Sequence, residues 1–212
     1  MKDIFKDPAR SKSWYARAEK RKTLIRKYLW DPERKLFFDY DFVHERRHKY
    51  VSATALYPLW AMDPGKEATK ILTPDEAKAL VKNLLAELEM AGGLAATSPA
   101  SLKEFGDPRH ARQWEYPTGW APHQIIAWQA LENYGFPKER ARLAEKWVSM
   151  ITQNAKDYNG TIPEKFDVVA RSHRVFAEYG NVGTEFSYIT REGFGWMNAS
   201  YQLGLKARHS RP

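Results

Sequence analysis

The chain has 212 residues, with 34 Lys+Arg against 26 Asp+Glu, 14% aromatic residues and no cysteine. Its length and its 43% hydrophobic content suffice for a buried core and exclude a disordered chain. The missing cysteine excludes disulfides, a thiolate nucleophile and cysteine-ligated zinc. Because neither a signal-peptide pattern nor a membrane-spanning apolar run is visible, we expect a cytoplasmic protein without a membrane contact.

Most of the net charge of +8 lies in the first 50 residues, which hold 15 Lys+Arg and 8 Asp+Glu. Seven of these cations lie on a helix-like stretch from Ser11 to Trp30, in which a helix is predicted at 13–29. Its apolar stripe would comprise Trp14, Ala18, Leu24, Ile25, Tyr28 and Leu29. A solvated helix face explains this pattern better than nucleic-acid binding, since no recognition module accompanies the charge. We therefore expect no nucleic-acid partner, and keep a basic nucleic-acid-binding protein as the lesser alternative.

Further along the chain, helices are predicted at 50–61, 74–90, 121–134, 138–153 and 194–206, and a short strand or hairpin arm at 35–42. The strongest signal is at 74–90, where Thr73 is a natural N-cap, Pro74 suits the first helical position and Glu76 completes a capping box. With about six helices in paired hairpins, the sequence predicts a single-domain all-α fold.

Two long loops are rich in aromatic and carboxylate side chains, one at 112–120 and one at 180–196. Loops of this kind are typical of binding surfaces, and flat aromatic faces beside carboxylates and amides suit a sugar. An equally weighted interpretation is that the tryptophans only close the end of a helical bundle.

One motif suggests a metal but has the wrong context. His44-Glu45-Arg46-Arg47-His48 spells the H-E-x-x-H of zinc proteases, which requires a helix. Here the segment follows an extended stretch, and two arginines would oppose a dication. We also find no glycine-rich phosphate loop, so we expect neither a metal nor a cofactor.

A family resemblance is carried by residues 113–122, Gln-Trp-Glu-Tyr-Pro-Thr-Gly-Trp-Ala-Pro. They resemble the second signature of the trehalases (glycoside hydrolase family 37), Q-W-D-x-P-x-G-W-x-P. The likeness continues in Glu164-Lys165-Phe166-Asp167-Val168, similar to E-K-Y-D-V, and in Glu192-Gly193-Phe194-Gly195-Trp196-Met197-Asn198. The pattern is most similar to that of the fungal neutral trehalases.

The resemblance implies an (α/α)₆ barrel of twelve helices, of which residues 1–212 would be the C-terminal half. It implies inverting hydrolysis of α,α-trehalose to two glucoses, with Glu164 as the general base. The family's general acid is an Asp in an E-S-G-W-D motif, which this sequence lacks. We therefore expect a partner, either an N-terminal trehalase half or a second copy bound through exposed helix faces.

The same resemblance implies sugar contacts, with Gln113 and Trp114 in the signature loop and Phe194 and Trp196 as pocket walls. A further substrate-binding Glu is either Glu178 or Glu185, and Trp120 is expected to be structural. Two departures stand out, since Glu115 replaces the signature Asp and Phe166 replaces the motif Tyr. They leave open an alternative, a non-catalytic trehalase relative that binds sugar or a protein partner.

Overall fold

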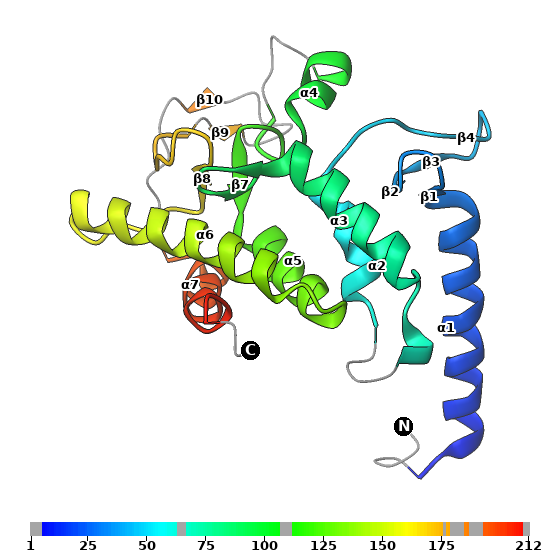
Figure 1. Cartoon of the computed structure of the whole chain (residues 1–212). Helices are drawn as coiled ribbons and strands as arrows, with labels where there is room; N and C mark the ends of the chain where they lie inside the picture. The colour runs from blue at the N-terminus through cyan, green and yellow to red at the C-terminus, as the bar shows by residue number, and fades with distance from the viewer. Residues whose placement is uncertain are drawn as a thin grey trace.

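The computed structural model describes residues 6–62, 67–106, 112–175, 177–178, 185–186 and 193–209. Its α-helices, labelled in Figure 1, are α1 (Pro8–Leu29), α2 (Tyr57–Trp60), α3 (Pro74–Leu88), α4 (Pro99–Phe105), α5 (Ala121–Asn133), α6 (Pro137–Asp157) and α7 (Gly195–Ala207). Short 3-10 helices occupy Ala53–Leu56 (η1) and Glu67–Thr69 (η2). Within the described ranges, no helix combines the length and the apolar character that crossing a membrane requires.

The strands are short and form two-stranded antiparallel pairs. β1 (Trp30–Asp31) pairs with β2 (Leu36–Phe37), β3 (Tyr40–Asp41) with β4 (Arg46–Arg47), and β5 (Glu89–Met90) with β6 (Gly93–Leu94). β7 (Thr118–Trp120) pairs with β8 (Lys165–Asp167), and β9 (Ala177–Glu178) with β10 (Glu185–Phe186). The first three pairs are local hairpins, whereas β7 and β8 lie far apart in the sequence and join two loops.

The helices α1, α2, α3, α5, α6 and α7 make up most of the helical body (Figure 1). The central helix is α5, which contacts α2, α6 and α7 and whose residues from Ala121 to Leu131 are all buried or half-buried. The all-α prediction is confirmed, and these six helices are half of the twelve in an (α/α)₆ barrel.

The local signals explain where the helices begin. Thr73 Oγ1 accepts from the Glu76 amide at 3.2 Å while Glu76 Oε2 accepts from the Thr73 amide at 2.9 Å, which is the predicted capping box. Proline also stands in the first turn of α1, α2, α4, α5 and α6, where its missing N–H is not needed. Apolar side chains recur at helical spacing along α6 and are fully buried, namely Leu143, Trp147, Met150 and Ile151.

One helix prediction was wrong in detail, and one helix was not predicted. The interval 50–61 is not one helix, because Ser52 pairs with Thr97, η1 follows, and α2 spans only four residues with Pro58 in its first turn. A proline in the middle of a continuous helix would remove one backbone hydrogen bond, which favours this break. The helix α4 was missed, although Ser98 caps it and Pro99 opens it.

The stripe predicted for α1 is also only partly buried. Trp14 is 50% exposed and Leu24 is 41% exposed, whereas Ile25 and Leu29 pack against the core. The C-terminal turns of α1 are held by Arg26, which donates to both carboxylate oxygens of Glu76 at 2.8 and 2.9 Å and to the carbonyl of Ile71 at 2.8 Å. The N-terminal turns of α1 therefore project from the body, as Figure 1 shows.

Candidate active site

The β7–β8 pair brings the signature loop next to the candidate base. Its register places Trp120 opposite Lys165, Gly119 opposite Phe166 and Thr118 opposite Asp167. Glu164 directly precedes β8, so it lies beside the end of β7 from which α5 begins. The pairing thus joins two motifs that lie far apart in the sequence.

Glycine is required where these strands cross the core. A Cβ on Gly119 would lie 2.9 Å from the carbonyl oxygen of Leu94 and would collide with the side chain of Val168. The loop before it is closed by the carbonyl of Gln113, which accepts from Trp120 Nε1 at 2.7 Å and from Thr118 Oγ1 at 2.6 Å. The tight packing at Gly119 and these two hydrogen bonds fix the position of the backbone from which the Gln113 and Trp114 side chains extend.

Aromatic rings form one face of the site. Trp114 stacks on Trp120 with ring centroids 3.8 Å apart and planes 8° apart, and Trp120 meets Trp196 edge-on at 6.0 Å. Phe194 stacks beside Trp196 at 6.1 Å. Trp120 is 1% exposed and Trp114 is 41% exposed, so Trp120 is the buried support and Trp114 has part of its ring exposed. An exposed part of an aromatic ring can pack against the apolar side of a sugar ring.

Lys165 is the charged centre of the site and is 1% exposed. Its Nζ donates to Gln113 Oε1 at 3.0 Å, lies 3.6 Å from Glu164 Oε2, and lies 4.8 Å from the centre of the Trp120 ring. Burial lowers the pKa of Lys165, and the Glu164 carboxylate opposes that shift. The acceptors and the ring compensate for the removal of the ammonium group from water.

Glu164, the general base that the resemblance implies, lies beside the buried Lys165. Its side chain is 12% exposed, and Lys165 supplies a nearby positive charge. Its buried Oε2 has no hydrogen-bond partner within the described part of the chain. This oxygen is closed off from solvent, and the ammonium group of Lys165, 3.6 Å away, partly offsets the cost of its burial.

Sequence reasoning missed the part played by His123, at the start of α5. Its ring lies edge-on to Trp114 at 5.3 Å and to Tyr57 at 6.3 Å. Burial lowers the pKa of His123 to about 4, so the ring is neutral near pH 7. The signal that could have identified His123 is its place in the sequence. It directly follows the signature residues at 113–122 and lies in the first turn of α5, which is buried.

The two departures from the trehalase pattern both have structural partners. Glu115 Oε1 accepts from the Tyr50 hydroxyl at 3.3 Å, and Glu115 Oε2 accepts from the Arg112 amide at 3.2 Å. Phe166 is fully buried and meets Trp147 edge-on at 6.0 Å. A tyrosine hydroxyl at position 166 would require a buried partner, so phenylalanine suits this packing.

The remaining predicted sugar residues are only partly placed. Glu178 and Glu185 lie directly opposite each other in the β9–β10 register, so their backbones meet at one point of the loop. The predicted loop residues at 180–184 and 187–192 lie outside the described residues. The choice between Glu178 and Glu185 as the substrate contact therefore stays a prediction.

The H-E-x-x-H sequence lies in the β3–β4 hairpin and not on a helix. His44 Nδ1 bonds the carboxylate of Asp41 at 2.6 Å, and Glu45 sits in the turn with φ 51°. Among the described residues, no group of three His, Asp or Glu side chains is arranged to hold a metal ion.

Comparison with known proteins identifies close relatives of this chain. A family model described as Trehalase matches residues 1–208. A probable trehalase from Eremothecium gossypii is 46% identical over 198 residues, which are 92% of this chain and 26% of that protein. The cytosolic neutral trehalase of Saccharomyces cerevisiae is 44% identical over 215 residues, or 98% of this chain and 28% of that protein. The chain therefore spans about a quarter of the length of these curated relatives.

Solved structures give the same relationship. The neutral trehalase of Saccharomyces cerevisiae matches with a TM-score of 0.73 at 41% identity, covering 93% of this chain and 31% of that one. A GH63 mannosylglycerate hydrolase from Thermus thermophilus, solved with glucose, matches with a TM-score of 0.64 at 19% identity, covering 94% of this chain and 41% of that one. The second likeness shows the fold alone. Both confirm that the helices belong to an (α/α)₆ architecture.

Proposed function

Because the chain belongs to the trehalase family, we propose that residues 1–212 are the C-terminal part of the catalytic domain of a glycosidase that hydrolyses α,α-trehalose. In this proposal Glu164 is the general base, and Gln113, Trp114, Phe194, Trp196 and one of Glu178 and Glu185 contact the sugar. No cofactor or metal takes part. The relatives named cytosolic neutral trehalases favour a cytoplasmic enzyme.

The observation that carries this proposal is the pairing of Glu164 with the buried Lys165 beside the Trp114–Trp120 stack. In an inverting glycosidase the base accepts a proton from water as the water oxygen bonds to the anomeric carbon. The glycosidic C–O bond breaks, and its oxygen takes a proton from a general acid. In this proposal Lys165 places a positive charge 3.6 Å from Glu164 Oε2, while the exposed part of Trp114 supports a glucose ring.

The general acid has to come from another segment, since this sequence lacks the E-S-G-W-D motif. We propose that a preceding trehalase segment supplies it and completes the barrel. The test co-expresses this chain with the part of the Saccharomyces cerevisiae neutral trehalase that precedes the matched region, and measures glucose released from trehalose. Restored activity supports the proposal, and a co-purified complex without activity contradicts it.

The role of Glu164 is tested in the same complex. Glu164→Gln should lower the rate by about 10²–10⁴-fold, because a neutral amide cannot accept the water proton. The matched control is Glu45→Gln, an exposed carboxylate in the β3–β4 turn, which should leave the rate unchanged. Equal rates for the two variants would assign the base to another residue.

The alternative, a non-catalytic relative that binds sugar, was suggested by Glu115 and Phe166. Both residues have a packing or hydrogen-bonding role in this structure, so neither departure favours a loss of catalysis. Calorimetric binding of trehalose by the completed complex without turnover would support this alternative.

A further inference from the structure

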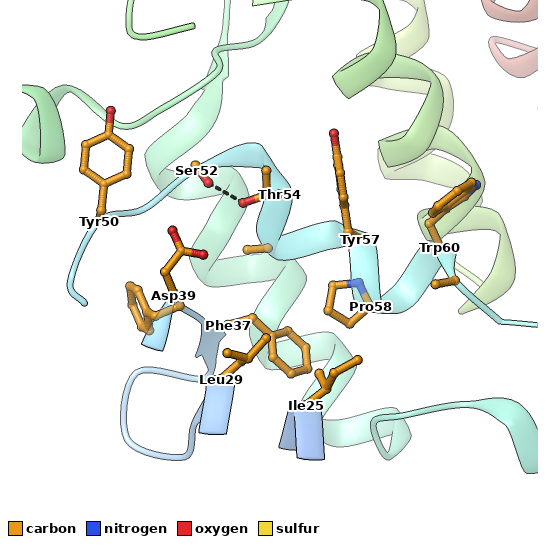
Figure 2. A pocket seen from close by; sticks show the side chains of 13 residues that line it. Ile25, Leu29, Phe37, Asp39, Tyr50, Ser52, Thr54, Tyr57, Pro58 and Trp60 are labelled. Carbon is orange, nitrogen blue, oxygen red and sulfur yellow. Dashed lines mark hydrogen bonds between the residues drawn. The ribbon is translucent and has the colours of Figure 1, made fainter. Parts of the chain in front are cut away.

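The signature loop is anchored by polar side chains on two sides. On one side Tyr50, which belongs to the side chains around the hollow shown in Figure 2, donates to Glu115 Oε1 at 3.3 Å. On the other side Lys165 Nζ donates to Gln113 Oε1 at 3.0 Å. Between Gln113 and Glu115 the loop carries Trp114, whose ring is partly exposed. Of the two anchors, the one at Gln113 is made by a buried charged group.

The bond between Lys165 and Gln113 forms in one orientation of the amide only. An ammonium group has three N–H donors and no acceptor, whereas a glutamine amide has an acceptor oxygen and a donor nitrogen. If the amide were turned over, Gln113 Nε2 would face the ammonium group, and two donors would oppose each other. The cation would also lose an acceptor at a place where Lys165 is 1% exposed and has little water to bond instead. Lys165 therefore holds Oε1 toward itself and Nε2 away.

Lys165 is held in place by more than the amide. It lies in β8 opposite Trp120 in β7, and its Nζ lies 4.8 Å from the centre of the Trp120 ring. Glu164 Oε2 lies 3.6 Å from the same nitrogen. The ring and the carboxylate both attract the ammonium group. The cation is therefore a fixed point to which the Gln113 amide adapts.

The nitrogen of the Gln113 amide is left for a ligand. Within the described part of the chain it donates to no protein acceptor, and it is not one of the buried atoms that lack a partner. Gln113 is half-buried, so this nitrogen meets solvent at the surface of the signature loop. It stands next to Trp114 in the sequence. A polar donor beside an aromatic ring is the combination that orients a sugar.

We infer that Lys165 is a positioning residue that turns the nitrogen of the Gln113 amide toward the substrate, so that Gln113 donates a hydrogen bond to a hydroxyl oxygen of the sugar. A sugar hydroxyl can donate or accept, so the protein decides the direction of this bond. At this one position the site then selects a group that accepts. The inference deepens the sugar contact of Gln113 in the proposed function and does not depend on Glu164 being the base.

The test measures the direction of this hydrogen bond with trehalose analogues in which one hydroxyl at a time is replaced by hydrogen or by fluorine. Fluorine accepts weakly and does not donate, whereas hydrogen does neither. The protein is this chain co-expressed with the preceding part of the Saccharomyces cerevisiae neutral trehalase, and calorimetry gives the Kd of each analogue. Glu164→Gln is present throughout to slow hydrolysis. If that variant still releases glucose at the unaltered rate, the catalytic proposal is contradicted, and inhibition of that hydrolysis then supplies the affinities.

At the hydroxyl that Gln113 contacts, the hydrogen analogue should bind about tenfold more weakly than trehalose, the value of one hydrogen bond. The fluorine analogue should bind more tightly than the hydrogen analogue. Gln113→Glu should reverse this order, because a carboxylate only accepts and repels fluorine. Gln202→Glu is the matched control, the same change at an exposed position on α7, and should keep the order.

Two results would overturn the inference in different ways. If the fluorine analogue never binds more tightly than the hydrogen analogue while Gln113 is intact, the sugar donates to the amide oxygen, and the sugar contact itself survives. If Gln113→Glu and Gln202→Glu give the same order of affinities at every hydroxyl, Gln113 does not contact the sugar, and that part of the proposed function fails as well.

The part played by Lys165 is tested by Lys165→Met in the same Glu164→Gln background, where neither charge of the pair remains. Without the ammonium group the amide can turn over, so the preference for the fluorine over the hydrogen analogue should shrink at least about threefold, a fraction of one hydrogen bond. A lysine with a merely structural role would change all affinities together, and an unchanged preference would overturn the inference.

A second measurement leaves Lys165 unaltered. In the chain with ¹⁵N-labelled glutamine, the Nε2 protons of Gln113 are identified by their loss in Gln113→Glu. They should exchange with water as those of the exposed Gln202 do, because Nε2 faces solvent. Protection of the Gln113 protons relative to those of Gln202 would place Nε2 inside the loop and would overturn the inference.

Discussion

Lys165 Nζ donates to Gln113 Oε1 at 3.0 Å, so a buried ammonium group ties the strand of the candidate base to the signature loop. The same nitrogen lies 3.6 Å from Glu164 Oε2. Gln113 therefore has a second role beside the sugar contact implied by the trehalase pattern. The side-chain oxygen of Gln113 positions Lys165, and the side-chain nitrogen of Gln113 takes no part in that interaction.

The first prediction concerns this buried charge pair. Lys165→Met should destabilise the chain by about 3–5 kcal/mol, because it leaves the Glu164 carboxylate in a poorly hydrated place without its cation. Adding Glu164→Gln to Lys165→Met should recover part of that loss, since neither charge then remains. Urea denaturation of the two variants measures the difference. A double variant no more stable than Lys165→Met would show that the charges are not coupled.

The second prediction separates the two stacked tryptophans. Trp120→Ala should cost about 3–5 kcal/mol of stability, because the side chain is fully buried beneath Trp114 and beside Trp196. Trp114→Ala should cost only about 0.5–1.5 kcal/mol, the value of an aromatic pair at a half-exposed position. Thermal melts of the isolated chain measure both changes.

Trehalose affinity gives the second readout of the same pair. In the completed complex, Trp114→Ala should weaken trehalose binding measured by calorimetry more than its small stability loss can explain, because its exposed face is the one offered to sugar. Unchanged binding by Trp114→Ala would indicate that this ring only covers the end of the helical bundle.

The sequence predicts elements whose signals are local and misses relations that depend on distant contacts. The capping box at Thr73 and the buried stripe of α6 follow from spacing alone. Lys165 follows Glu164 directly in the sequence, and such a pair is typical of a surface; only the β7–β8 pairing buries it. The apolar stripe of α1 shows that a helix face is to be covered, but spacing does not say by which segment. Trp14 and Leu24 belong to this stripe and are half-exposed.

The third prediction concerns the signature departure Glu115. Glu115→Asp restores the family residue but shortens the side chain, which should break the 3.3 Å bond from the Tyr50 hydroxyl. We expect a loss of about 1 kcal/mol, the usual net value of one hydrogen bond. Tyr50→Phe should lose a similar amount, and the double variant should lose little more than either. Additive losses in urea denaturation would show that the two side chains are independent.

The fourth prediction concerns pH and His123. Burial holds the pKa of this ring at about 4 in the folded chain, against an ordinary value of 6.5. Between about pH 6.5 and pH 4 the unfolded chain therefore binds a proton that the folded chain does not bind. The free energy of unfolding should fall as the pH is lowered through that window, and above it His123 should have no further effect on stability.

His123→Gln removes this titration while keeping a polar side chain of similar size. The urea midpoint of the unaltered chain should decrease between pH 6.5 and pH 4, and that of His123→Gln should decrease less over the same interval. His44→Gln is the matched control, because His44 lies on the exposed β3–β4 turn and bonds Asp41 there. If the two variants show the same pH dependence, protonation of His123 is not what limits stability, and the contact between its ring and Trp114 must tolerate a charged imidazole.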